Sequence, residues 1–111
     1  MSAIQKSGLE TAVLDRFHQL YEAQGFPPAD SIAVLRRENT GGGRYVDLEC
    51  DSPVHLDDGY IDLGGGYIEM RGIPNGMMAV VLMKGGRVRT LEFTVYGGDS
   101  WDGDEAEWRL V

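Results

Sequence analysis

The chain has 111 residues, of which 42% are hydrophobic, and its formal net charge is −8 at pH 7. This length and composition predict one α+β or similar globular domain, residues 1–111, whose core needs no disulfide or metal. The excess of acidic residues argues against a nucleic-acid partner, because carboxylates repel phosphates. Cys50 is the only cysteine, which excludes an intramolecular disulfide.

The N-terminal segment MSAIQKSGLE lacks the basic start and the apolar run of a signal peptide. No window holds the roughly 18 consecutive apolar residues that a membrane-spanning helix needs. We therefore expect a cytoplasmic protein that does not insert into a membrane.

The first expected element is a helix over residues 9–23. Ser7 and Glu10 have the spacing of a capping box, in which each side chain accepts a hydrogen bond from an amide at the helix start. The apolar positions that then recur at helical intervals are Leu9, Val13, Phe17 and Leu20. Gly25 and Pro27 predict the end of this helix.

Beyond the helix the pattern becomes alternating, which is typical of β-strands. The expected strands cover residues 31–38, 44–50, 60–63, 67–71, 77–83, 88–96 and 106–110. We expect a hairpin across Gly64–Gly66, a turn at Pro74–Gly76, and a tight hairpin loop at Lys84–Arg87. One helix followed by five to seven strands predicts an α+β fold, with the N-terminal helix packed on an antiparallel β-sheet.

The residue types offer no clear catalytic set, so we expect a protein that is not an enzyme and has no cofactor. Cys50 sits in a strand and is expected to be a small core residue. His18 falls just off the apolar stripe of the helix, and with His55 it completes no structural zinc pattern. The glycine runs precede strands and lack the Lys-Ser/Thr of a phosphate-binding loop.

Calcium is the better metal candidate. A glycine-containing loop near the end of the sequence offers hard oxygen ligands from Asp99, Asp102, Asp104 and Glu105. Their spacing does not match an EF-hand. A small-ligand or calcium-binding module is therefore the alternative function.

Carboxylates are concentrated in the second half of the chain, where no Lys or Arg occurs between Val46 and Met70. A second acidic group surrounds Trp101. Tryptophan is enriched at binding hot spots, and acidic side chains speed association with a basic protein, although Trp101 can also fold back to cover the sheet. The residues that we expect to contact a basic protein partner are Asp57, Asp58, Asp62, Glu69, Asp99, Trp101, Asp102, Asp104 and Glu105.

A family resemblance rests on the segments Asp58–Ile61, Ile73–Leu82, Gly86–Val88 and Leu91–Tyr96. They combine an apolar strand, a glycine-containing turn, and a strand that reads Leu-Glu followed by an aromatic residue and Tyr. In this the second half of the chain resembles small bacterial immunity proteins of polymorphic and contact-dependent toxin systems. It departs from their pattern in Gly97–Trp101, because no proline follows the Trp. The resemblance implies a cytoplasmic protein that binds a cognate toxin domain, often a nuclease, and blocks its active site.

Overall fold

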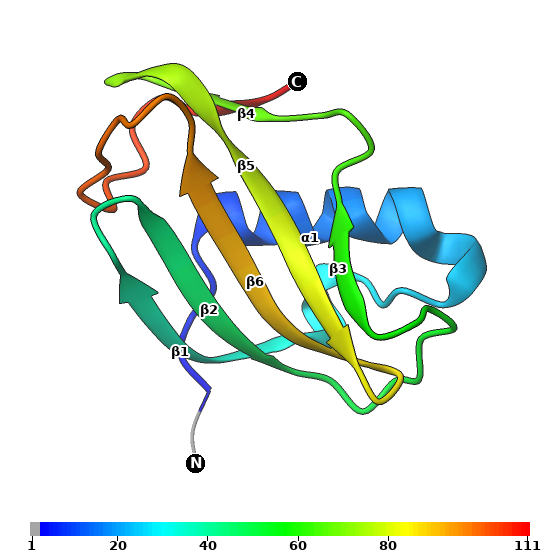
Figure 1. The fold of residues 1–111 in the computed structure, drawn as a ribbon. Coiled ribbons are helices and arrows are strands. Elements are labelled where there is room, and N and C mark those ends of the chain that lie inside the picture. Colours follow the sequence, from blue (N-terminus) through cyan, green and yellow to red (C-terminus); the bar gives the residue numbers. More distant parts are fainter. Residues whose placement is uncertain (1–2) are drawn as a thin grey trace.

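The computed structural model describes residues 3–111 (Figure 1). Its elements in chain order are α1 (Gly8–Tyr21), the 3-10 turns η1 (Glu22–Gln24) and η2 (Ala29–Ser31), and the strands β1 (Ala33–Asn39), β2 (Gly43–Glu49), β3 (Gly59–Asp62), β4 (Ile68–Met70), β5 (Ile73–Lys84), β6 (Arg87–Val95) and β7 (Arg109–Leu110). The α+β class expected from the sequence is confirmed.

The strands form one antiparallel sheet in the order β1-β2-β6-β5-β4-β7, and β3 pairs with β5 outside this path. The β5–β6 hairpin lies at the centre of the sheet. Figure 1 shows α1 crossing behind the sheet, whereas no helix within residues 3–111 covers the opposite face. One side of the sheet is therefore exposed to solvent.

The helix begins where the capping box predicts. The Glu10 amide donates to the Ser7 hydroxyl at 3.1 Å, and the Ser7 amide donates to the Glu10 carboxylate at 3.0 Å. The α-helix ends at Tyr21, two residues before the expected end, and the chain turns at Gly25 with φ +87°. Leu20 is 45% exposed, so its expected place on the apolar face is wrong. No helix in the described part of the chain is long and apolar enough to cross a membrane.

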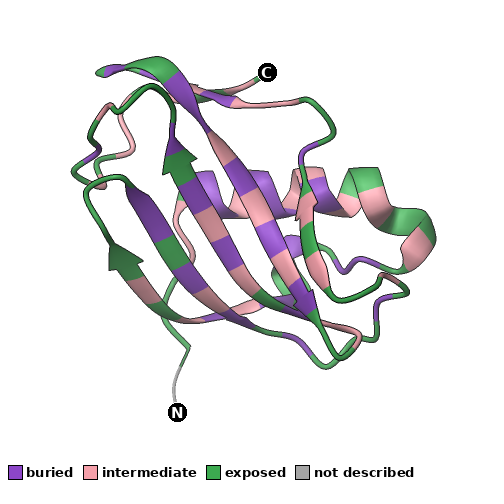
Figure 2. Ribbon diagram, viewed as in Figure 1, coloured by how far each residue is buried: buried purple, intermediate pink, exposed green. Residues whose placement is uncertain are grey.

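The core lies between α1 and the inner face of the sheet. Buried and solvent-contacting residues alternate along the central strands (Figure 2), as the period of two predicts. The largest fully buried apolar side chains include Leu9, Leu14, Phe17, Phe26, Ile32, Ile68, Met77, Met83 and Leu91. Cys50 is a free thiol at the edge of this core, which confirms the prediction made for it.

Two local expectations are wrong. The strands on either side of Gly64–Gly66 do not form a hairpin, because β3 and β4 both pair with β5, at Val80–Met83 and Ile73–Met77 respectively. With twelve residues, β5 is long enough to pair with two short strands end to end. Pro74–Gly76 lies within β5, and the chain reverses instead at Gly72, whose φ of +87° favours glycine.

Candidate functional site: the open sheet face and its groove

No helix of residues 3–111 covers the sheet face opposite α1 (Figure 1), and we call this face the open face. Strand register determines which side chains it presents, because alternate residues point to the same side. Its residues are Arg36 and Glu38 of β1, Tyr45, Asp47 and Glu49 of β2, Thr90, Glu92 and Thr94 of β6, Met78, Val80 and Leu82 of β5, and Tyr60 and Asp62 of β3.

An apolar strip runs along the open face between polar strands. Met78, Val80 and Leu82 follow β5 and are half-buried, without any element packed over them. Tyr45 and Tyr60 flank the strip and are 50% and 60% exposed. When a partner removes half-exposed apolar side chains and tyrosine rings from water, the free energy of the system falls, which favours binding. The strip is therefore suited to contact with another protein.

Glu92 lies at the centre of this surface. The strand register places it opposite Tyr45 on one side and opposite Val80 on the other. Hydrogen bonding with the Glu92 side chain, and the charge of its carboxylate, raise the pKa of Tyr60. The two tyrosines and Glu92 therefore form one cluster that spans β2, β6 and β3.

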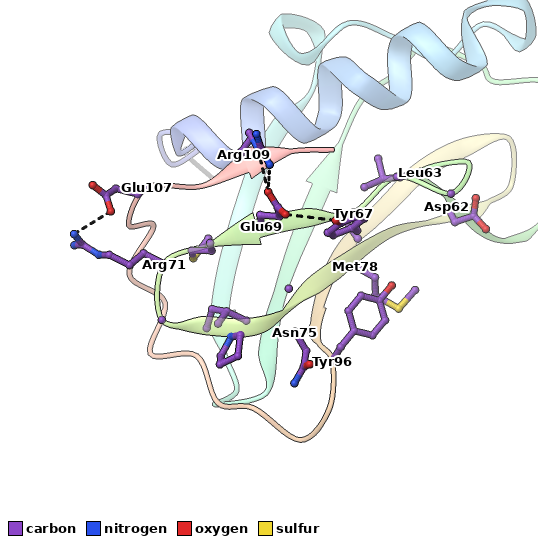
Figure 3. Close-up of a pocket in the computed structure, with 18 residues that line it drawn as sticks. Asp62, Leu63, Tyr67, Glu69, Arg71, Asn75, Met78, Tyr96, Glu107 and Arg109 are labelled. Atoms are coloured by element: carbon purple, nitrogen blue, oxygen red, sulfur yellow. Dashed lines mark hydrogen bonds and ion pairs between the residues drawn. The ribbon is translucent and has the colours of Figure 1, made fainter.

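A groove of about 1080 Å³ opens at one end of the sheet, beside β4 and β5 (Figure 3). It arises because β3 pairs with β5 only as far as Val80, and β4 begins to pair at Met77. Met78 and Ala79 between them have no strand partner on that side. The apolar side chains that line the groove include Leu63, Tyr67, Met70, Ile73, Met78 and Tyr96.

Apart from Asp62, the charged side chains that line the groove are engaged with one another. Glu69 accepts hydrogen bonds from Arg109 Nε at 3.0 Å and from the Tyr67 hydroxyl at 3.4 Å. Arg71 pairs with Glu107 at 3.0 Å. The groove thus offers apolar and aromatic side chains next to paired charges.

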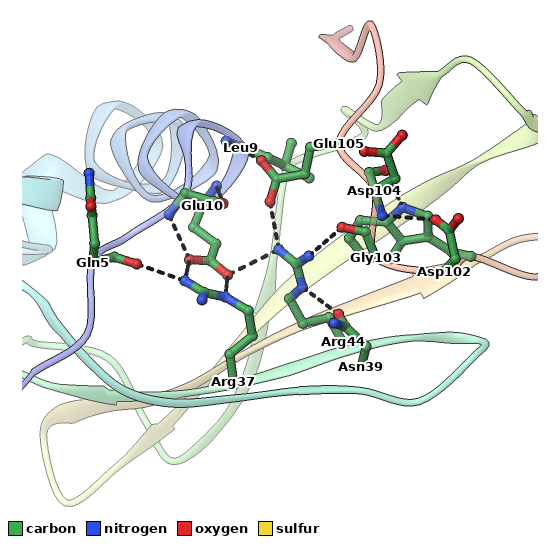
Figure 4. A network of polar contacts seen from close by, with 12 residues as sticks. Gln5, Leu9, Glu10, Arg37, Asn39, Arg44, Asp102, Gly103, Asp104 and Glu105 are labelled. Atoms are coloured by element: carbon green, nitrogen blue, oxygen red, sulfur yellow. Dashed lines mark hydrogen bonds and ion pairs between the residues drawn. The ribbon is translucent and has the colours of Figure 1, made fainter.

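A buried ion network lies on the helix side of the sheet (Figure 4). Arg44 donates to Glu10 at 3.1 Å and to Glu105 at 2.7 Å, and Arg37 Nε donates to Glu10 at 2.6 Å. Burial opposes ionisation of Glu10, but the bonds from Arg37 and the Ser7 amide and the charges of Arg37 and Arg44 lower its pKa. Because Glu105 also accepts from the Leu9 amide at 3.1 Å, the network joins the helix start to the last loop.

Trp101 belongs to the core, not to the surface. Its side chain is 3% exposed, its ring meets Phe93 edge-on at 6.1 Å, and the Arg44 guanidinium lies 4.6 Å from the ring centroid. Its indole N–H donates to the Asp104 carbonyl at 2.7 Å. The interpretation that Trp101 folds back over the sheet is therefore correct. The Trp101 and Glu105 side chains are thus engaged within the fold and do not belong to the open face.

The two acidic segments expected to act together lie at opposite ends of the β5–β6 hairpin. Asp57 and Asp58 precede β3, where Asp58 accepts from the Gly85 amide at 2.8 Å. Asp99 lies beyond the other end of β6 and accepts from the Asn75 side chain at 3.2 Å. Of the other acidic residues expected to bind a partner, Asp62 and Glu69 line the groove, and Asp102 and Asp104 are exposed on the last loop.

Within residues 3–111, no group of three or more His, Cys, Asp and Glu side chains is arranged to hold a metal ion. Three of the four side chains proposed as calcium ligands have other partners. Asp99 contacts Asn75, Asp102 accepts from the Asp104 amide at 2.9 Å, and Glu105 contacts Arg44. The described residues therefore give no support to the calcium alternative.

Sequence reasoning missed the cluster of Tyr45, Tyr60 and Glu92. Tyr45 and Glu92 were visible as members of alternating strands, but their cross-strand pairing depends on β2 lying beside β6, which the pattern does not reveal. The usable signal was an aromatic residue on the polar side of a strand. Tyr45 interrupts an otherwise acidic face of β2 in this way.

The chain is thus an α+β domain with one uncovered sheet face and a groove at the end of that face. No protein-family model, curated protein or solved structure matches it. The chemistry of the open face and the groove is therefore the basis for the function proposed below.

Proposed function

We propose that the chain is a non-enzymatic, cytoplasmic protein-binding domain that neutralises a cognate bacterial toxin as an immunity protein. The observation that carries this proposal is the open face, where exposed tyrosines and carboxylates flank an apolar strip. Interfaces of standard size bury about 800 Å² on each partner. The molecule measures 37 × 32 × 21 Å, so its broad side is large enough for such an interface.

The net charge of −8 favours a basic partner. An acidic surface attracts a basic protein over a distance and orients it before contact, which raises the association rate. A nuclease toxin carries a basic cleft for its substrate, and an acidic inhibitor that covers this cleft prevents the substrate from entering. The exposed Asp57 and Asp58 would lie at the edge of such an interface, since they immediately precede β3, whose Tyr60 belongs to the open face.

The test compares two double variants with the same change in net charge. Asp47→Lys with Glu49→Lys reverses charge on the open face, whereas Glu22→Lys with Asp30→Lys reverses it beside α1, in η1 and η2. The genes adjacent to that of the chain are searched for a toxin domain, each variant is co-expressed in bacteria with that domain, and growth and the Kd of the purified pair are measured. We expect the open-face variant to lose protection and to bind about 100-fold more weakly. The variant beside α1 should protect and bind as the native chain does.

Equal loss in both variants would show that only total charge matters, and the open face would not be the docking surface. A native chain that neither binds the toxin domain nor protects the cells would contradict the immunity function itself.

The groove favours a second candidate function, the binding of a small apolar or aromatic ligand. Its volume of about 1080 Å³ and its lining by Tyr67, Met78 and Tyr96 resemble small-molecule sites, which are concave and mostly apolar. Screening aromatic fragments by NMR would test it, with resonances of Gly65 and Gly76 as reporters of the groove. Fragments that leave these resonances unchanged would contradict this candidate.

A further inference from the structure

Glu92 is unusual among the carboxylates of the open face because it is half-buried and has no cationic partner. Within residues 3–111, it takes part in none of the ion pairs, whereas Glu38 and Asp47 on neighbouring strands share Arg36 at 2.9 and 4.0 Å. A cation supplied by a partner can therefore pair with this carboxylate without displacing an existing ion pair.

Two aromatic rings flank this carboxylate. Tyr45 stands directly across the β2–β6 ladder from Glu92, and Tyr60 reaches toward it from β3, across the apolar strip of β5. The rings are among the most exposed large side chains of the described residues. Their faces can therefore contact an incoming group that also reaches the carboxylate.

The surface is hollowed at the same place. A depression of about 280 Å³ is lined by Arg36, Glu38, Tyr45, Asp47, Thr90 and Glu92. Three carboxylates face one guanidinium in this lining, and that guanidinium already contacts Glu38 and Asp47. The depression therefore has excess negative charge and is complementary to one additional cationic side chain.

We propose that this depression is the seat of an arginine side chain from the basic protein partner, with Glu92 pairing the guanidinium and Tyr45 and Tyr60 stacking against it. Arginine fits better than lysine, because its planar group bonds a carboxylate through two N–H groups and stacks on aromatic rings at the same time. Arginine and tyrosine are also the residues that contribute most at protein interfaces. The inference rests on the proposed function and specifies what the partner must present to the open face.

The test uses three short peptides, Ac-Gly-X-Gly-NH2, in which X is arginine, its neutral isostere citrulline, or lysine. Each is titrated into the 15N-labelled chain, and the resonances of Tyr45, Thr90 and Glu92 are followed. We expect the arginine peptide to shift these resonances, the citrulline peptide to leave them unchanged, and the lysine peptide to bind more weakly. Glu92→Gln should weaken the arginine peptide about tenfold.

Glu49→Gln is the matched control, because Glu49 lies on the same face but outside the depression. It should bind the arginine peptide as the native chain does, and well-dispersed spectra of both variants exclude unfolding as the cause of any loss. Citrulline shifts equal to those of arginine would overturn the proposal. So would lysine binding as tight as arginine binding, or arginine shifts that persist in Glu92→Gln.

Failure of this inference is distinguishable from failure of the immunity function. If Glu92→Gln protects cells and binds the toxin domain as the native chain does, the arginine seat is wrong while the proposed function stands. If the native chain binds the arginine peptide at the depression but does not bind the toxin domain, the seat stands and the identity of the partner is wrong.

Discussion

Arg44 shows how single residues hold this fold together. Its side chain is almost fully buried and contacts carboxylates from the helix start and from the last loop, while its guanidinium also lies over the Trp101 ring. The Asn39 side-chain oxygen and the Gly103 carbonyl accept two further N–H groups, at 2.8 and 2.9 Å. Each of the three guanidinium nitrogens thus donates to an acceptor, which offsets the cost of burying the charge.

Glu10→Gln removes one charge from this network. We expect it to lower the free energy of unfolding by about 3 kcal/mol, because Arg44 and Arg37 lose a shared anion in a buried site. Urea denaturation measures the loss. Glu38→Gln breaks the exposed pair with Arg36 and should cost under about 1 kcal/mol. A smaller loss for Glu10→Gln than for Glu38→Gln would contradict a stabilising role of the network.

The lowered pKa of Glu10 also predicts a dependence of stability on pH. Because the carboxyl ionises more readily in the folded state, its contribution is fully present above its usual value of 4.5 and is lost as pH falls through the lower folded value. We expect the free energy of unfolding, followed by urea denaturation from about pH 7 to about pH 3, to fall less steeply in Glu10→Gln. Equal slopes would show that other carboxylates dominate acid unfolding.

Among the elements, the β2–β6 ladder depends on one close backbone approach. A Cβ added to Gly43 would lie 1.8 Å from the Phe93 carbonyl oxygen, whereas one added to Gly42 would meet nothing within 4 Å. We expect Gly43→Ala to destabilise the protein by about 3 kcal/mol, and Gly42→Ala to change stability by under about 0.5 kcal/mol. Thermal unfolding followed by circular dichroism measures both. Similar melting temperatures for the two variants would contradict this close packing.

Local signals were sufficient to predict most elements from the sequence. The capping box, the stop at Gly25 and the β5–β6 hairpin at Lys84–Arg87 each depend on residues close together in the chain. The order of the strands in the sheet does not depend on residues that are close together in the chain. Nothing local indicates that β3 and β4 pair with β5 and not with each other, because this follows from the length of β5.

The candidate site was less predictable for the same reason. Asp62 and Glu69 were expected to face a partner, and both line the groove. Trp101, in contrast, packs into the core against Phe93 and against Arg44, which lies far from it in the sequence. Because the contact with Arg44 depends on the arrangement of the strands, a sequence window around Trp101 cannot reveal it.

At the scale of the whole molecule, we expect the net charge to determine whether two copies of the chain associate through the open face. At neutral pH the net charge of −8 opposes self-association, whereas near the pI of about 4.5 the repulsion vanishes and the apolar strip remains exposed. We expect a 12.2 kDa monomer at about pH 7.5 and reversible association near the pI, measured by analytical ultracentrifugation. Leu82→Glu, which adds a charge to the strip, should reduce this association more than Ser100→Glu on the last loop. Equal effects of the two variants on association would show that the copies contact each other through another surface.

The bond between the Leu9 amide and Glu105 joins residues that are 96 positions apart. During synthesis the helix therefore emerges from the ribosome long before Glu105, whose carboxylate accepts from the Leu9 amide. Arg44 also emerges before Glu105, which is the second of its two carboxylate partners. Contacts between such distant residues slow folding. The ion network can close only after nearly the whole chain has been released, so the contact that ties the helix start to the last loop is among the last to form.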